Sequence, residues 1–174
     1  MVATFQSTVQ QFQPSGIVGE IILSGPRRAS PQILASTSAA NNVIGRAFRH
    51  VGTNDLNVTA DATGVFAGIL VHPKSYATSG PATGTLDPTL ALPNNTIVEV
   101  LSMGIIIVDL SQDSPTAPRR NIGDNVWFED ATGVLVGVNS ATTTVASYTQ
   151  VPNATIVRNN VDGDPGLAII QLTN

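Results

Sequence analysis

Histidine and cysteine chemistry is limited from the outset, because the chain has only two histidines, His50 and His72, and no cysteine. A zinc site needs several histidine, cysteine or carboxylate ligands that converge, and the short-range ligand spacings typical of such a site are absent. We interpret each histidine as a strand-end residue with a hydrogen-bonded ring. The sequence therefore predicts no metal and no cofactor.

The acidic residues do not form a catalytic pattern. Glu129, Asp130 and Asp124 could suggest the paired acids of a glycoside hydrolase, but adjacent strand residues face opposite sides and these acids flank a turn. We interpret them as solvated turn residues. The segment Asp162–Gly166 offers the clustered oxygens that Ca²⁺ prefers but lacks the spacing of a calcium loop, so we predict a tight turn there.

Nucleophile and phosphate-binding signatures are also missing. The segment Leu101–Gly104 contains a serine but lacks the first glycine of a strained nucleophile elbow. No phosphate-binding loop or dinucleotide fingerprint occurs. We therefore predict that the protein is not an enzyme.

Arginine doublets are the clearest charged feature of a chain that is poor in charge. Arg27–Arg28 and Arg119–Arg120 each stand beside a proline, and only 11% of all residues are charged, against a usual share near 25%. Lys74 is the one lysine beside seven arginines, and interfaces favour arginine over lysine. The doublets therefore indicate contacts to a partner's carboxylates or carbonyls, with solvated loop charge as the alternative.

Length and net charge narrow the class of protein further. A chain of 174 residues fits one domain, and a net charge of −4 without a basic stripe argues against direct nucleic-acid binding. Apolar runs such as Ile105–Val108 are too short to cross a membrane, and residues 1–14 lack the basic start and apolar core of a secretory signal. We read the surface as one made for contact; a merely weakly charged soluble domain is the alternative.

A five-residue repeat carries the strongest local signal. Asp-Ala-Thr-Gly-Val occupies residues 61–65 and returns 69 positions later at residues 130–134. Aspartate opening a turn and glycine free to take positive φ are typical of a hairpin with a bulged return strand. We therefore predict two hairpins, which pair residues 56–60 with 65–71 and 125–129 with 134–138, and positive φ at Gly64 and Gly133.

Short β-branched runs separated by glycine and proline predict an all-β fold, a compact antiparallel β-sandwich or barrel with an extended N-terminal arm and long Pro-rich loops. We expect an arm over residues 1–15 and a single β-rich domain over 16–174. Residues 27–42, 73–95 and 111–120 are expected to be loops. The expected strands outside the hairpins span residues 17–23, 43–48, 96–101, 104–110, 142–148, 154–158 and 167–172.

Several segments, in this order, resemble the capsid cement (decoration) proteins of tailed bacteriophages. They are Gly16–Ile21, Gly25–Ala29, Val43–Phe48, Ile122–Phe128, Thr132–Leu135 and Gly166–Asn174. The resemblance implies a virion protein on the outer capsid surface that bridges major capsid protein subunits, commonly as a homotrimer at local threefold positions. It has no catalytic residues to transfer. It makes Phe5, Phe12, Arg27, Arg28, Arg119 and Arg120 the candidate interface residues.

A carbohydrate-binding or adhesin-like β-sandwich is the alternative function. In that case the loop of residues 73–95 would hold a sugar. Such a site uses exposed aromatic rings on one face, and the chain has only one tryptophan, two tyrosines and five phenylalanines.

Overall fold

The described part of the protein is built almost entirely of β-strands, as predicted. The structure is a computed structural model and describes residues 16–22, 25–52, 54–72, 91–110, 121–161 and 164–173. These ranges contain no α-helix, only the 3₁₀ turn η1 (Ala39–Asn41), and no helix that could span a membrane. The strands are β1 (Ile21–Ile22), β2 (Arg28–Leu34), β3 (Ala47–Val51), β4 (Asn54–Thr59), β5 (Phe66–Leu70), β6 (Ile97–Asp109), β7 (Asn125–Glu129), β8 (Leu135–Val138), β9 (Tyr148–Val161) and β10 (Asp164–Leu172).

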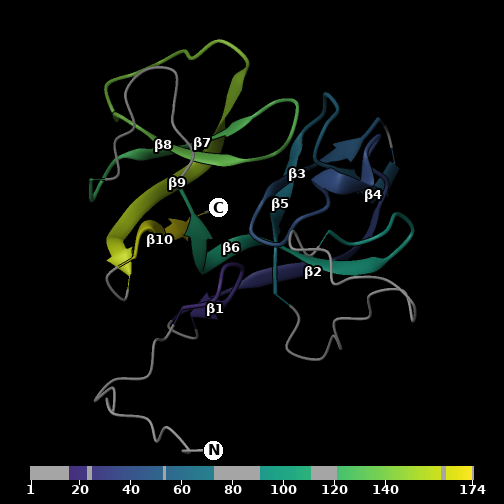
Figure 1. Ribbon diagram of the computed structural model, residues 1–174, viewed down its shortest axis with the longest axis horizontal. Coiled ribbons are helices and arrows are strands. Elements are labelled where there is room, and N and C mark those ends of the chain that lie inside the picture. Colours follow the sequence, from purple (N-terminus) through teal and green to yellow (C-terminus); the bar gives the residue numbers. More distant parts are fainter. Residues whose placement is uncertain are drawn as a thin grey trace, which may run out of the picture.

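Five strands close into a small barrel in the order β2-β4-β3-β5-β6, with β6 pairing back to β2 (Figure 1). All of these pairs are antiparallel except β2 with β4, which is parallel. The barrel interior is filled by buried apolar side chains, including Leu34, Phe48, Val58, Leu70 and Val100. Closure matters because it leaves few unpaired backbone groups in this half of the molecule.

The long strand β6 belongs to both halves of the protein. Up to Met103 it pairs with β2 and β5, and from Gly104 onward it pairs with β1 and β10. It thereby joins the barrel to a second sheet of order β1-β6-β10-β9-β7-β8. We predicted two runs divided at Met103–Gly104. The pairing partners do change at this point. The strand itself is continuous, because isoleucine and valine favour extended backbone throughout.

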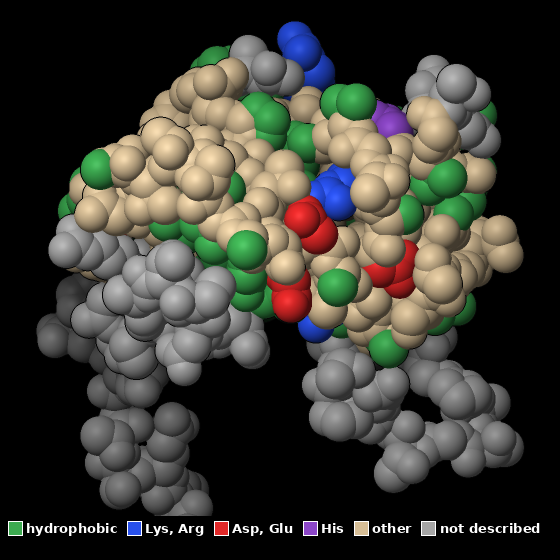
Figure 2. Space-filling model, turned by 90° about the horizontal axis from the view of Figure 1, so that it is seen from above, with side chains coloured by type: hydrophobic (Ala, Val, Ile, Leu, Met, Phe, Trp, Pro, Cys, Tyr) green, Lys and Arg blue, Asp and Glu red, His purple; other side chains and the backbone are tan. Residues whose placement is uncertain are grey.

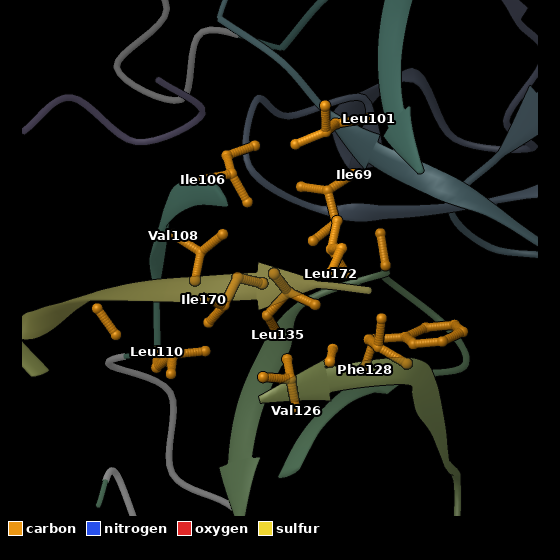
Figure 3. Packing of buried hydrophobic residues seen from close by; sticks show 14 of the residues in the cluster. Ile69, Leu101, Ile106, Val108, Leu110, Val126, Phe128, Leu135, Ile170 and Leu172 are labelled. Carbon is orange, nitrogen blue, oxygen red and sulfur yellow. The ribbon is translucent and has the colours of Figure 1, made fainter. Parts of the chain in front are cut away.

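One apolar cluster lies between the barrel and the second sheet. Ile69 and Leu101 come from the outer side of the barrel, and Ile106, Phe128 and Leu172 come from the second sheet. Figure 3 shows these side chains pointing into a shared space. Fully burying one such side chain contributes about 1.5–3 kcal/mol, so this cluster is a main source of cohesion between the two halves.

Residues 28–34 were predicted as loop, and this prediction is wrong, because they form β2. Proline and small polar residues suggested a loop, yet six residues of this segment pair with β6. The hydrogen bond from Leu34 N–H to the Thr96 carbonyl, 3.0 Å long, sets the alternation of the ladder. It points the backbone nitrogen of Pro31 away from β6, where a missing donor is tolerated.

The first predicted hairpin is also wrong, whereas the second is confirmed. β4 and β5 do not pair with each other but flank β3 on its two sides. The hairpin in this region is β3–β4, which turns at Gly52 with φ of 58°. β7 and β8 pair as predicted, and Gly133 has φ of 71° as expected. Gly64 lies outside the left-handed region, contrary to the prediction.

Other strand boundaries differ from the predicted ones by several residues. The runs predicted at residues 17–23 and 43–48 correspond to β1 and β3, and of residues 142–148 only Tyr148 lies in a strand. The predicted arm, residues 1–15, the loop residues 73–90 and the link of residues 111–120 lie outside the described residues.

Alanine at Gly133 is expected to lower the free energy of unfolding by about 1 kcal/mol or more, because a Cβ there would be strained and would collide with the Ala47 carbonyl oxygen. Alanine at Gly64 is expected to destabilise only through collision with the His50 carbonyl oxygen. Equilibrium urea unfolding measures both. Gly25→Ala is the control, because Gly25 has φ of +105° and no atom within 4 Å of an added Cβ. A loss at Gly133 no larger than at Gly25 would contradict the collision.

Candidate functional site

The two Asp-Ala-Thr-Gly segments lie side by side around the buried side chain of Arg49. Its Nη1 donates to the Ala62 carbonyl of the first segment at 2.9 Å, and its Nη2 forms an ion pair with Asp130 of the second. The same Nη2 donates to Thr149 Oγ1 at 2.9 Å. The guanidinium carbon lies 4.4 Å from the centre of the Phe128 ring, a cation–π contact. One arginine thus connects β3 of the barrel with two strands of the second sheet.

Asn41, which is polar and uncharged, is the centre of a second bridge between the repeated segments. Asn41 Nδ2 donates to Asp61 Oδ2 at 3.1 Å and to the Ala131 carbonyl at 3.4 Å. Arg46 Nη1 donates to Asn41 Oδ1 at 3.3 Å and to the Thr132 carbonyl at 3.2 Å. Burial lowers the pKa of the Arg46 guanidinium, and the negative charge of Glu129 opposes that shift.

Asp61 organises the backbone beside it rather than opening a hairpin turn. Its carboxylate accepts hydrogen bonds from Thr37 N–H and Ser38 N–H, both at 2.8 Å, and from the Thr59 hydroxyl at 2.7 Å. Burial alone would raise the pKa of Asp61. The hydrogen bonds from Ser38, Thr59, Thr37 and Asn41 outweigh it, so the pKa lies below its usual value.

A hollow of about 290 Å³ opens over this cluster, but its groups are already engaged with one another. Both carboxylates that line it, Asp61 and Asp130, accept several hydrogen bonds, and neither histidine reaches the lining. Nowhere in the described ranges do three potential metal ligands come together. The arrangement is therefore suited to joining the two sheets.

The interpretation as solvated turn residues is wrong for Asp124, which is buried, whereas Glu129 and Asp130 stay partly exposed and also have partners within the protein. Asp130 pairs with Arg49, and Glu129 accepts a 2.5 Å hydrogen bond from the Thr132 hydroxyl. Asp124 is buried and accepts a hydrogen bond from Asn121 N–H at 3.1 Å. The repeated motif pointed at Asp130, but no local signal indicated that Arg49 would be its partner.

The histidines lie apart from this cluster. His50 is on β3, and its buried Nδ1 has no hydrogen-bond partner among the described residues. His72 follows β5 and lines a different hollow, beside Ile44 and Val134. Neither histidine shares a site with the other.

Two of the predicted interface residues, Arg27 and Arg28, are described and exposed, one just before β2 and one at its start. Phe5, Phe12, Arg119 and Arg120 lie outside the described residues. Charged side chains are few on the face that Figure 2 shows, and acidic and basic groups stand next to one another there. Arg27 and Arg28 form no ion pair with an acidic residue of the described ranges, and their exposure makes them available for contact.

These arginines belong to a surface that we name the β2–β6 face, in which Ile33 is half-buried and the other members are exposed. It consists of Arg27, Arg28, Ala29, Pro31, Ile33, Ile97 and Glu99. In the ladder, Ile33 stands opposite Ile97 and Pro31 stands opposite Glu99. Ile97 is 65% exposed, which is unusual for so large an apolar side chain beside another isoleucine. The face thus combines apolar contact area with charges at two places.

The backbone edge beside the β2–β6 face is poorly suited to strand addition. β4 pairs only with Ile33 and Leu34 of β2, so residues 28–32 have no second strand partner among those described. Pro31 lacks an N–H on that open side. Contacts through this face would therefore use side chains.

The sequence matches the family described as "Structural cement protein (E217 gp24/Pam3 gp6)" over residues 5–173. Among solved structures, the fold is similar to a chain of "The capsid of Myoviridae Phage XM1", with a TM-score of 0.60 and 15% identity over 99% of each chain. At that identity the likeness concerns the fold alone. No curated protein matches the sequence.

Replacing Arg49 with methionine is expected to lower the free energy of unfolding by about 1–3 kcal/mol. The substitution removes the ion pair with Asp130, which keeps its hydrogen bond from Thr149, and leaves the Ala62 carbonyl without the Arg49 donor. Chemical denaturation measures the loss. Arg28→Met is the matched control at an exposed position and is expected to change stability by less than about 0.5 kcal/mol. Equal losses in the two variants would contradict a bridging role for Arg49.

Stability is expected to fall in acid through Asp61. Because the folded pKa is lowered, the stabilisation is present above the unfolded value near 3.8 and is lost as the pH falls through the folded value. Between about pH 5 and pH 2, wild type should therefore lose more unfolding free energy than Asp61→Asn. Denaturation series across this range measure both slopes. Glu99→Gln controls for removal of an exposed carboxylate, and identical slopes in wild type and Asp61→Asn would refute the assignment.

Proposed function

The chain belongs to the phage structural cement protein family, and on that premise we propose that it binds the outer surface of the assembled head and bridges neighbouring major capsid subunits. Membership makes it a structural component of the virion. A cement protein works by adding contact area across the seams between shell subunits. Any ligand that binds the assembled form more tightly than the free parts stabilises the assembly.

The β2–β6 face is the surface that we propose makes this contact. The exposed Ile97 and the half-buried Ile33 opposite it provide apolar area, which contributes about 25 cal/mol for each Å² removed from water. Arg27 and Arg28 provide planar, fork-shaped donors that fit carboxylates and carbonyls on a partner. Glu99 stands between the two groups along the face and adds a charge of opposite sign, which favours one register over others.

The proposal extends to parts of the chain beyond this face. The arm of residues 1–15, with Phe5 and Phe12, and the doublet Arg119–Arg120 are further proposed contacts. Residues 16–174 would act as a single β-rich domain behind the arm. We also propose that copies associate as homotrimers at local threefold positions, where each copy meets more than one capsid subunit and the contacts reinforce one another.

Co-sedimentation with emptied, expanded heads of the source phage tests the proposal. Wild type is expected to sediment with the heads, and Arg27→Glu combined with Arg28→Glu is expected to lose at least about tenfold in affinity, since two reversed charges cost more than 1.4 kcal/mol. Arg158→Glu is the matched control, because Arg158 is exposed on β9 in the second sheet.

The possible results distinguish an error in the proposed function from an error in the proposed contact surface. Failure of wild type to bind the heads would refute the function. Normal binding by wild type and by the double variant alike would keep the function and refute the β2–β6 face as its contact.

A further inference from the structure

Two turns of matching sequence pack against each other where the barrel meets the second sheet. Ile17-Val18-Gly19 precedes β1, and Val43-Ile44-Gly45 precedes β3. A hydrogen bond from the N–H of the following residue to the carbonyl of the first residue closes each turn, 2.9 Å long at Glu20 and 3.3 Å long at Arg46. Both glycines have φ of 83°, the conformation of the third residue in a type II turn.

The two turns hold each other in place. A methyl group of Ile44 lies against Gly19, and a methyl group of Val18 lies against Gly45, so a Cβ at either glycine would collide with it. The glycine N–H groups also donate to carbonyls of β6 and β5, at 2.7 and 2.8 Å. The turns therefore form walls that are fixed before a partner binds.

A hollow of about 340 Å³ lies beside these turns, and we name it the paired-turn pocket. Its apolar walls are the aliphatic side chains of both turns and of Val134 and Leu135, and its polar members are Arg46, His72 and Asp109. The volume is at the lower end of the range of roughly 300–1,000 Å³ for ligand pockets. It leaves room for one projecting aliphatic side chain with its flanking backbone.

The charges in the pocket lining favour an uncharged occupant. Arg46 and Asp109 have opposite signs, so an ion attracted to one of them is repelled by the other. Part of the Arg46 guanidinium is already engaged, because its Nη1 donates to Asn41 and to the Thr132 carbonyl. An aliphatic side chain would instead cover the walls and remove Ile17, which is 60% exposed, from water.

The barrel carries an apolar projection with these properties. Val65, just before β5, is 76% exposed, and Leu56 on β4 is 58% exposed. His50 N–H donates to the Val65 carbonyl at 2.9 Å, and Gly64 packs so closely on the His50 carbonyl that a Cβ would collide with it. Residues 63–66 have no charged side chain. Val65 is therefore a firmly held, uncharged apolar group.

The pocket and this projection lie at opposite ends of the same strands. β3 begins directly after Arg46 of the pocket, whereas β5 begins directly after Val65 and ends just before His72 of the pocket. The seven residue steps from Val65 to His72 correspond to roughly 20 Å of strand. One copy therefore cannot place its own Val65 in its own pocket. Contacts that join two different surfaces of identical copies are heterologous and form rings when the rotation closes.

We propose that the paired-turn pocket receives Val65 of a second copy of this chain, with Leu56 of that copy against the pocket rim at Ile17, so that copies join head to tail in a closed ring. The match in charge supports this occupant, because the projection is uncharged and the charges of the pocket oppose each other. The inference rests on the proposed self-association and names the two surfaces that would form the contact.

Disulfide trapping in the full-length protein tests this contact, and the absence of native cysteines leaves only introduced thiols to react. In an Ile17→Cys/Val65→Cys double variant the two positions of one chain lie at opposite ends of β5, beyond the Cα separation of about 4.4–6.8 Å that a disulfide spans. A disulfide between them therefore joins two copies. Mild oxidation is expected to give covalent species larger than a dimer on a non-reducing gel. Each single-cysteine variant, and an Ile17→Cys/Ile122→Cys control at another exposed isoleucine, is expected to give at least fivefold less of them.

Val65→Asp tests the same contact without a cross-link. It would place a carboxylate against aliphatic walls and near Asp109, and is expected to weaken self-association at least about tenfold in sedimentation velocity. Ile122→Asp, at a residue that is 70% exposed, is the matched control and is expected to leave self-association unchanged.

Three results would overturn the proposal: a wild type that stays monomeric at the concentrations used for trapping, equal linking in the double variant and its controls, or equal self-association of Val65→Asp and Ile122→Asp. Protection of Ile17→Cys from alkylation only on heads would assign the pocket to a capsid subunit and would also overturn it. Circular dichroism identical to wild type shows that each variant is folded. Because the trapping and sedimentation experiments contain no heads, their failure is distinct from a failure of head binding.

Discussion

The buried guanidinium of Arg49 sets the arrangement on which the rest of the molecule depends. A cation removed from water needs a partner for its donors, and Arg49 finds them in Asp130, Thr149 and the Ala62 carbonyl while its plane lies against Phe128. These partners come from both sheets. Any sliding of one sheet over the other would separate them and leave charge unpaired. The apolar cluster between the sheets provides cohesion, whereas this network selects one relative position.

Several of the few charged side chains form contacts within the protein. Arg46, Arg49, Asp61 and Asp130 are engaged at the seam between the repeated segments, where they make hydrogen bonds within the protein. The β2–β6 face is left with apolar and small side chains, flanked by a few charges. A surface of this kind gains from being covered, and it suits a protein of the virion whose role is contact.

The two halves manage their strand edges differently. The barrel closes on itself, and its one open edge carries Pro31, which removes a donor and discourages strand addition. In the second sheet β8 pairs only with β7 among the described strands, and all four of its residues are buried. The barrel thus protects its edge by closure and by Pro31, whereas the second sheet buries its last strand. Both arrangements limit strand pairing with other chains.

The sequence by itself determined the all-β class, the β7–β8 hairpin and the left-handed glycine at position 133, because residue propensity and turn chemistry act over a few neighbours. Only the tertiary structure decided the fate of the identical first repeat. There β3 lies between β4 and β5, so the same five residues span a strand instead of turning a hairpin. Likewise, residues 28–34 became a strand because β6, some seventy residues away, supplied partners. Strand pairing and ion-pair choice depend on groups distant in sequence, which local patterns do not encode.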